Sequence, residues 1–368
     1  MRQTCGPIRR SSWRRAPCHP VPILPRSRPS PVWRTSPIAV RCCAWGGRGW
    51  ISTAPPSGRV PKSIVLDLDD TFDAVHGGQQ LRLFNAHHDE YGFQRIVVFD
   101  GDGRFMTAIL RPAKRPKGTE IRAFLRRLLR AIRANWPNTR ILIRADSHYC
   151  CPGAPPSGVA EVIDFCRARG LDFTLGVAPT TTLRRHIEEL EASTKARFEA
   201  GAKTAKLRRF TEFFDGAKSW SRVERIIALV EAGEQGADTK FIVTNLAGGK
   251  PKALYERLYC RLGMAENHIK SWKPHLAADR TSCTKATANQ FRLFLHAGAY
   301  WLMWGLRVMM PKRSIWRVAQ FDTLRLRLIK IAARVVEMKT QIRLHLPTAC
   351  PYQPIMRVAL SRLPRLVA

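Results

Sequence analysis

Acidic residues are scarce in this sequence. Of its 368 residues, 28 are Asp or Glu and 62 are Lys or Arg, so the formal net charge is +34. A hydrophobic content of 45% is enough to fill a core, which indicates a folded protein. Because clustered Lys and Arg release counterions when they neutralise phosphates, the charge indicates a polyanion as the partner, with nucleic acid as the first candidate.

The first part of the chain has no acidic residue at all. Residues 1–61 contain no Asp, Glu or Lys, and their apolar residues follow neither a period of two nor one of 3.6. The prolines between Pro20 and Pro31 would break the amphipathic helix of a transit peptide. We predict that this Arg- and Pro-rich segment is disordered, and we interpret it as a stretch that is not an evolved domain.

Paired cysteine motifs and long apolar runs are lacking too. None of the 10 cysteines belongs to a CxxC pair and no histidine spacing completes a zinc site, which favours free thiols in a reducing compartment. The longest apolar run, Phe291 to Leu306, is interrupted by Arg292 and His296 and is shorter than the roughly 20 residues of a bilayer span. We therefore expect a buried helix there, and no membrane association.

Ordered structure is predicted to begin at Ser63. The expected elements are an apolar strand from Ile64 that ends in carboxylates, strands over Arg95–Phe99 and Arg104–Leu110 joined by a Gly-rich turn, a helix that Thr119 caps and Trp136 closes, a strand over Ile141–Ile143, a helix over Glu161–Arg169 and a strand over Leu171–Val177. This β-β-β-α-β-α-β order is that of a ribonuclease-H-like α/β fold, a mixed sheet with flanking helices.

The composition divides the chain further. The predicted parts are the disordered segment 1–61, the first part of the core at 62–178, a β-rich insertion subdomain at 179–249, core helices at 250–310 and a basic C-terminal segment at 311–368. Within them we expect a flexible loop over Cys151–Ala160, a helix over Leu183–Phe198, strands over Arg222–Val230 and Lys240–Asn245, and a strand-rich run over Leu324–Leu346.

Three Asp residues stand where two of the predicted strands end. Asp67 and Asp69 are two positions apart, so their side chains point to one face, and Asp146 follows a strand that the topology places alongside. Like charges packed this closely repel one another unless a cation neutralises them, and a hard divalent metal with oxygen ligands is the usual solution. The pattern therefore predicts a carboxylate metal site.

A third carboxylate is expected from a helix. Tyr259, Glu266 and Lys273 are spaced by seven residues, which is almost two helical turns, so on a continuous helix they share one stripe. Lys270, four residues after Glu266, joins that stripe. A carboxylate flanked by cations on one helix face suits a metal ligand beside a bound phosphate.

These motifs resemble those of DDE transposases from bacterial insertion sequences. The stretch Tyr259–Lys273 is similar to their Tyr-x2-Arg-x3-Glu-x6-Lys signature, although Leu262 occupies the Arg position and Arg261 stands one residue earlier. The resemblance covers the chain from about Ser63 to the C-terminus. Three further runs resemble those of insertion-sequence family thirteen-eighty: Val65–Gly77, Arg144–Tyr149 and Leu276–Ser282.

The resemblance implies roles for the site residues. Asp146 and Glu266 would be the second and third catalytic carboxylates and metal ligands, and the first would be either Asp67 or Asp69. The residues that would contact DNA are Tyr259, Arg261, Lys270 and Lys273.

The resemblance also implies a reaction, cofactors and partners. The reaction would be metal-dependent cleavage and strand transfer of insertion-sequence ends, with two Mg²⁺ or Mn²⁺ ions supporting phosphoryl transfer. The partners would be double-stranded DNA, as transposon ends and as target, and a second copy of the chain in a synaptic homodimer. The location would be the bacterial cytoplasm, at the nucleoid.

Two alternatives to an active transposase are open. Ile64–Thr71 also resembles the DxDxT opening of haloacid-dehalogenase-type phosphatases, with Asp67 as nucleophile and Asp69 as acid-base partner, although Asp146 lacks the acidic neighbour that this fold requires later in the chain. The chain can also be a defective transposase that binds DNA without transposing, because residues 1–61 replace the region in which the family recognises DNA ends.

Overall fold

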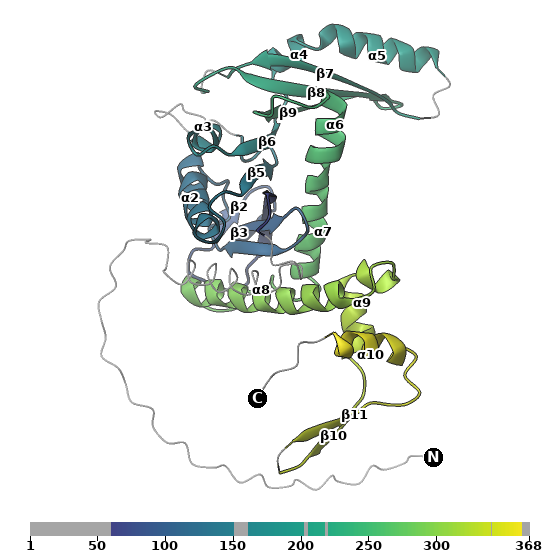
Figure 1. The fold of residues 1–368 in the computed structure, drawn as a ribbon. Coiled ribbons are helices and arrows are strands. Elements are labelled where there is room, and N and C mark those ends of the chain that lie inside the picture. Colours follow the sequence, from purple (N-terminus) through teal and green to yellow (C-terminus); the bar gives the residue numbers. More distant parts are fainter. Residues whose placement is uncertain (1–59, 151–160, 202–204, 218–219, 340, 363–368) are drawn as a thin grey trace, which may run out of the picture. The chain divides into compact units, whose positions relative to one another are not determined.

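The computed structural model describes residues 60–150, 161–201, 205–217, 220–339 and 341–362 (Figure 1). The predicted disorder of residues 1–61 and the predicted loop over Cys151–Ala160 fall almost wholly outside these residues. The described part is a mixed α/β structure. Its main sheet consists of β1 (Ser63–Ala74), β2 (Leu83–Asn85), β3 (Glu90–Asp100), β4 (Phe105–Ile109), β5 (Arg140–Ala145), β6 (Asp172–Val177), β7 (Leu207–Asp215), β8 (Glu224–Gly233) and β9 (Gly236–Thr244).

The sheet has the strand order β2-β3-β1-β5-β6-β9-β8-β7, and β4 pairs with β3 beside β2. β1 runs parallel to β5 and β5 parallel to β6, whereas the other neighbours are antiparallel. With α2 (Gly118–Asn135) and α3 (Glu161–Ala168), the first part of the chain follows the predicted order of elements, to which the short β2 is added.

Strand β1 differs from its prediction. We expected an apolar strand that ends in carboxylates, but the strand continues through Asp67, Asp69 and Asp70 to Ala74. The reason lies in β3, which pairs with β1 from Leu66 to Ala74 and so supplies ladder hydrogen bonds along the whole acidic stretch. These bonds outweigh the low strand preference of Asp.

The hairpin of β3 and β4 has the predicted Gly-rich turn. Gly103 adopts a φ of +80°, a conformation that favours glycine. Asp100 Oδ1 accepts hydrogen bonds from the backbone N–H groups of Asp102 and Arg104, and Asp102 is ion-paired with Arg104. These acids therefore stabilise the turn.

Helices α2 and α3 pack on one face of the sheet (Figure 1). The apolar stripe of α2, which includes the buried Ile121 and Leu125, lies in one cluster with Leu66 and Leu68 of β1. The predicted Thr119 cap is wrong, because the helix begins at Gly118 after the N-cap Lys117. There the carboxylate of Glu120 accepts a hydrogen bond from the backbone N–H of Lys117, and the helix begins two residues earlier than a Thr119 cap would allow.

The segment predicted as an insertion forms α4 (Thr181–Arg185), α5 (Glu188–Ala200) and the strands β7, β8 and β9. Strand β7 was not predicted. β9 pairs with β6 over Thr174–Val177, so these strands prolong the same sheet. The chain then leaves β9 for the helical segment that carries Glu266.

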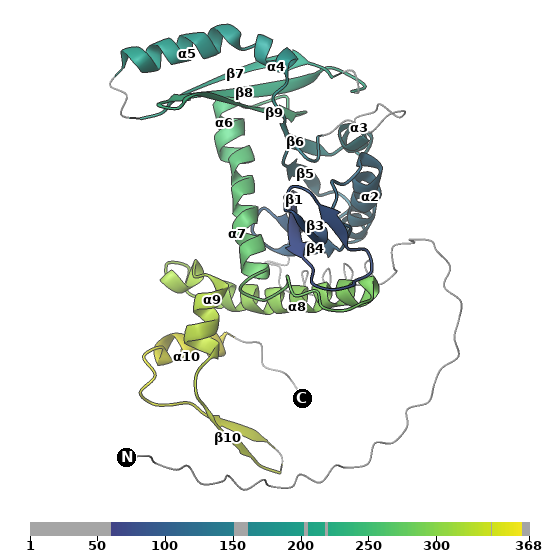
Figure 2. The same ribbon diagram turned by 180° about the vertical axis from the view of Figure 1, so that it is seen from behind.

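This helical segment changes pitch along its length. It consists of α6 (Pro251–Ala253), a π-helical turn (Leu254–Leu258), a 3₁₀ turn (Tyr259–Leu262) and α7 (Gly263–Trp272). α7 contacts β1 and β3, and it lies across the sheet from α2 (Figure 2). The irregular turns precede Gly263, so the Tyr259–Lys273 stretch is one helical segment but not one regular α-helix.

The long helix α8 (Ala286–Met309) buries Leu293 and Tyr300 in a second core with Phe99 and Phe105. The elements after it are a 3₁₀ turn (Ile315–Arg317), α9 (Phe321–Leu324), a π-helical turn (Arg325–Ile329), the two-stranded sheet of β10 (Arg334–Glu337) and β11 (Ile342–His345), and α10 (Gln353–Ser361). In the described part of the chain, no helix has the length and apolar character that a bilayer crossing requires.

The prediction of strands over Leu324–Leu346 is therefore only half right. Residues 324–329 are helical, because Leu324 and Leu328, four residues apart, share one helix face and are both buried in the second core. The alternation of Leu and Arg suggested a strand, and tertiary packing overrode it. The strands begin at Arg334.

Candidate active site

The parallel pairing of β1 and β5 brings two predicted carboxylates together. Leu68 is in register with Ala145, the last residue of β5, so Asp69 and Asp146 occupy the next positions on neighbouring chain segments. Adjacent strands lie about 4.8 Å apart. The two side chains therefore meet at one edge of the parallel strands, as the sequence pattern predicted.

Asp67 has a different environment from Asp69. Its carboxylate is almost fully buried and is bound at both oxygens by Arg144, with Nε at 2.5 Å from Oδ1 and Nη2 at 2.7 Å from Oδ2. Such a bidentate pair satisfies the acceptors of the carboxylate and neutralises its charge. Asp67 thus differs from Asp69 in having both of its oxygens bound by a guanidinium group.

Asp69 lies among carboxylates. Its burial, together with the charges of Asp146, Asp70 and Glu266, raises its pKa from 3.8 to about 7. Burial likewise raises the pKa of Asp146. A group of acids that oppose one another's ionisation in this way is a strong attractor for a cation.

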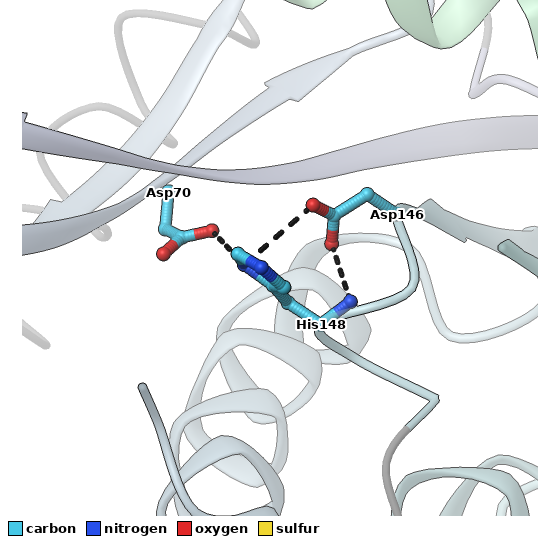
Figure 3. A group of neighbouring side chains, drawn as sticks. All are labelled: Asp70, Asp146 and His148. Atoms are coloured by element: carbon cyan, nitrogen blue, oxygen red, sulfur yellow. Dashed lines mark hydrogen bonds and ion pairs between the residues drawn. The ribbon is translucent and has the colours of Figure 1, made fainter. Parts of the chain in front are cut away.

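Asp70 and His148 stand beside Asp146 (Figure 3). His148 Nδ1 lies 3.2 Å from Asp70 Oδ1 and 3.7 Å from Asp146 Oδ2, and the backbone N–H of His148 donates to Asp146 Oδ1. Burial acts to raise the pKa of Asp70, but hydrogen bonds from His148 and Gln94 outweigh it and lower the pKa. The hydrogen bond to Asp70 in turn raises the pKa of His148.

These three residues form a group that could hold a metal ion. One ligand atom from each of Asp70, Asp146 and His148 lies within 4.8 Å of the others. Among the described residues, Asp69, Asp146 and Glu266 do not form a group this tight; the charges of Asp146 and Glu266 act on Asp69. The donors are mostly carboxylate oxygens, which suit Mg²⁺ and Mn²⁺.

The helical segment brings Tyr259 and Glu266 to these acids. Glu266 is exposed on α7 and is close enough to Asp69 to raise the pKa of that residue. The Tyr259 hydroxyl lies next to Gly176 and the backbone of Ser147. Burial and the neighbouring Asp146 raise the pKa of Tyr259 to about 12, so its hydroxyl is protonated at neutral pH and can donate a hydrogen bond.

The three cations that the resemblance assigns to DNA contact lie in two kinds of environment. Arg261 and Lys270 are exposed. Lys273 is mostly buried, and its ammonium group donates to Thr71 Oγ1 and to the carbonyl of Phe72. Arg261 and Lys270 are thus available to a ligand in solvent, whereas Lys273 contacts β1.

Asp70 and His148 were not among the predicted site residues. In the structure, His148 forms a hydrogen bond with Asp70. The alternation of side chains along β1 did not indicate Asp70, because consecutive strand residues point to opposite faces and the predicted acids Asp67 and Asp69 share the other face. Asp69 therefore faces α7, and Asp70 reaches the site from the other side of the strand, next to the turn after β5.

Comparison with known proteins identifies a family for this chain. Residues 48–368 match a family described as the transposase DDE domain of group 1. No curated protein matches the chain. Among solved structures, the chain is similar to one in the crystal structure of the Mos1 mariner paired end complex with Mn, with 13% sequence identity and a TM-score of 0.20. That match covers 41% of this chain and 46% of the other, so the chain spans less than half the length of this relative.

Proposed function

The chain belongs to the family of the transposase DDE domain of group 1, and from this membership we propose that it cleaves and joins the ends of an insertion sequence with Asp69, Asp146 and Glu266 as its three carboxylates. The observation that carries the proposal is the parallel pairing of β1 and β5, which brings Asp69 next to Asp146. Burial of Asp69, together with the charges of Asp146, Asp70 and Glu266, raises the pKa of Asp69 to about 7. A folded protein keeps mutually repelling carboxylates when a bound cation relieves the repulsion.

We assign the first catalytic position to Asp69 and not to Asp67. Arg144 binds both oxygens of Asp67, whereas Asp69 faces Asp146 and Glu266. The same ion pair disfavours the phosphatase alternative, since a nucleophilic Asp67 would need an oxygen free to attack phosphorus.

Divalent metal fits this set of residues. Mg²⁺ or Mn²⁺ would be held by Asp69, Asp146 and Glu266, and a second ion would share Asp146 with Asp70 and His148. When bound, such ions activate water or a DNA 3′-hydroxyl for in-line attack and stabilise the leaving oxygen.

The protein's own residues concentrate and orient charge. The carboxylates create a strongly negative site, and the hydrogen bonds of His148 to Asp70 and Asp146 fix the side chain of Asp146. The protonated Tyr259 hydroxyl is a donor beside these acids and suits a phosphate oxygen of DNA. Arg261 and Lys270, exposed on the same helical segment, supply positive charge for the DNA backbone.

Several finer assignments belong to the same proposal. We propose that the first part of the sheet with α2 and α3 is a ribonuclease-H-like core, that residues 179–249 are inserted into it, and that residues 311–368 form a basic C-terminal part. We further propose membership of insertion-sequence family thirteen-eighty and a homodimer in the synaptic complex. Double-stranded DNA is the partner that a net charge of +34 favours.

Nicking of supercoiled plasmid in Mg²⁺ or Mn²⁺ tests the proposal. We expect metal-dependent nicking by the wild-type chain and its loss in Asp69→Asn, Asp146→Asn and Glu266→Gln. The losses should exceed the roughly 10- to 100-fold cost of changing a residue that only supports a metal ligand. Asp102→Asn is the matched control, because Asp102 is an exposed acid of the β3–β4 turn.

Two other outcomes would contradict the proposal in different ways. DNA binding by a correctly folded wild-type chain that nicks no plasmid with either metal would identify the defective-transposase alternative. Nicking that persists at full rate in all three carboxylate variants would show that the three acids are not the catalytic centre.

A further inference from the structure

One face of β1 is polar and lies beneath a helix. Leu66 and Leu68 point to the apolar core with α2, so Asp67, Asp69 and Thr71 alternate with them on the opposite face. That face meets α7. Asp69 is the central residue of this polar row.

A buried cation ties the row to the start of the helical segment. Arg144 on β5 binds Asp67 and also donates from Nη1 to the carbonyl oxygen of Leu258, the last residue of the π-helical turn. Arg144 and Asp67 are both almost fully buried. The pair with Leu258 forms the first clamp, which joins β1, β5 and the helical segment before Glu266.

A second buried cation ties the row to the end of α7. Lys273 Nζ lies 2.9 Å from Thr71 Oγ1, 2.6 Å from the carbonyl oxygen of Phe72 and 2.9 Å from Asp73 Oδ1. An ammonium group has three N–H donors. Two are used in hydrogen bonds to β1 and the charge faces Asp73, so Lys273 has little left to offer a phosphate.

The contacts of Lys273 with Thr71, Phe72 and Asp73 form the second clamp, and further buried residues hold Asp73 in place. Asp73 is also ion-paired with Arg95, whose guanidinium lies 4.9 Å from the ring centre of Trp272. Arg95 Nη1 donates to the carbonyl of Ala278, in the chain that follows α7. Arg95, Asp73 and Trp272 are all buried, which fixes the end of α7 against β3 and β1.

The two clamps are about equally far apart along the helical segment and along β1, and Glu266 and Asp69 lie between them. A helical segment from Leu258 to Lys273 rises about 22 Å at 1.5 Å per residue. The strand from Asp67 to Asp73 covers about 20 Å at 3.3 Å per residue. Glu266 lies near the middle of the first interval and Asp69 near the middle of the second.

We propose that Lys273 is a positioning residue, which acts with the Arg144–Asp67 pair to hold Glu266 over Asp69, and that it is not a DNA contact. This inference rests on the proposed function, because it assigns Asp69 and Glu266 to one metal site. It gives Lys273 a role different from the one that the sequence resemblance implied. It also explains why Asp67, so near the site, is sequestered by Arg144.

Mn²⁺ binding to the full-length, DNA-free protein separates positioning from charge. Removal of a cation near a metal site would by itself strengthen Mn²⁺ binding, because a repulsive charge is lost. Loss of the second clamp should weaken Mn²⁺ binding, because Glu266 is no longer held in place. We therefore expect Lys273→Met to weaken Mn²⁺ binding by about 10- to 100-fold, the cost typical of a residue that orients a metal ligand.

Three variants complete the experiment, with free Mn²⁺ measured by electron paramagnetic resonance. Lys270→Met removes the same charge from the same helix but no clamp, and is expected to leave Mn²⁺ binding unchanged or slightly tighter. Lys273→Arg keeps a cation with several donors and should restore part of the affinity. Thr71→Val removes a single acceptor of the clamp and should weaken Mn²⁺ binding less than Lys273→Met, which keeps the test decisive if Lys273→Met does not fold.

Duplex binding in EDTA provides the second measurement. Lys273→Met should leave the salt dependence of DNA affinity unchanged, whereas loss of a phosphate contact lowers the slope of log K against log salt by about one. Unchanged or tighter Mn²⁺ binding in Lys273→Met, or a slope lowered by one, would overturn the positioning role. A wild-type chain that binds no Mn²⁺, or Mn²⁺ binding that stays intact in Asp69→Asn, would contradict the proposed function. The role of Lys273 in metal binding would fail with it.

Discussion

Gly176 on β6 leaves room for the hydroxyl group of Tyr259. A Cβ atom at position 176 would lie 2.6 Å from that oxygen and 2.9 Å from the backbone nitrogen of Ser147. Both distances are shorter than any ordinary contact of a methyl group. The side chain of Tyr259, the turn after Asp146 and strand β6 are therefore packed against one another without space for a single extra carbon.

Gly176→Ala should disturb the site without touching a carboxylate. We expect a loss of about 1–3 kcal/mol in the free energy of unfolding, as for other overpacked sites, and a fall in metal-dependent nicking because Tyr259 and the backbone after Asp146 must move. Combining Gly176→Ala with Tyr259→Phe removes the nearer of the two clashing atoms. The double variant should therefore be more stable than Gly176→Ala alone. If the changes in unfolding free energy of the two single variants, measured in urea, simply add in the double variant, the packing that we describe is contradicted.

Asp67→Asn and Asp69→Asn should change stability in opposite directions. Asp67→Asn leaves Arg144 buried without its charged partner, which costs about 3–5 kcal/mol for pairs of this kind. Asp69→Asn removes a carboxylate whose ionisation is opposed by burial and by the neighbouring acids, so at pH 8 without metal the variant should be more stable than the wild type. Urea unfolding of the two variants at this pH measures both effects, and a destabilised Asp69→Asn would argue against the charge repulsion.

The buried acid Asp100 predicts a pH dependence of stability. Burial raises its pKa from 3.8 to about 6, so between these values the folded protein binds more protons than the unfolded chain does. The contribution of Asp100 to the free energy of unfolding is therefore greatest below pH 4. This contribution falls by roughly 3 kcal/mol as the pH rises to about 6. Asp100→Asn, which can still accept the backbone N–H groups of the turn, should flatten this loss.

Asp102→Asn is the control for that measurement. Asp102 lies in the same turn, but its side chain is 71% exposed. Its removal should leave the difference in unfolding free energy between pH 4 and pH 7 as it is in the wild type. An unchanged pH profile in Asp100→Asn would mean that Asp100 titrates like an exposed acid.

Arg261 should contribute to DNA binding through charge alone. The residue is exposed on the 3₁₀ turn before α7, one position before the Arg of the transposase signature. Arg261→Gln is expected to weaken binding to any duplex sequence alike and to reduce the salt slope by about one. Fluorescence anisotropy with two unrelated duplexes checks this, and a loss confined to one sequence would point to a base contact.

Much of the sheet could be predicted from the sequence. The strands around the first two acids are short apolar runs bounded by turn residues, and the helix α2 has a clear apolar stripe that ends at Trp136. Because β1 and β5 are parallel, their acids had to meet at the same edge. Local patterns and chain order were therefore sufficient to bring Asp69 and Asp146 together.

The sequence was a poor guide where distant contacts decide the structure. The pairing of β1 with β3 extends the strand through its acids, and burial of Leu328 makes a helix of a stretch that alternates like a strand. Nothing local distinguishes Asp67 from Asp69, because the difference is made by Arg144, 77 residues away. The same holds for Lys273, whose partners on β1 no helical periodicity can reveal.

The two clamps also determine when the proposed site is assembled during synthesis. The hydrogen bond of Lys273 to Thr71 joins residues 202 positions apart, and that of Arg144 to Leu258 joins residues 114 apart. Translation delivers the chain from its N-terminus, and contacts of such high sequence separation form late because their loops must close first. A nascent chain thus presents Asp69 and Asp146 without the helix that completes the site. The three proposed catalytic carboxylates are therefore brought together only after most of the polypeptide has left the ribosome.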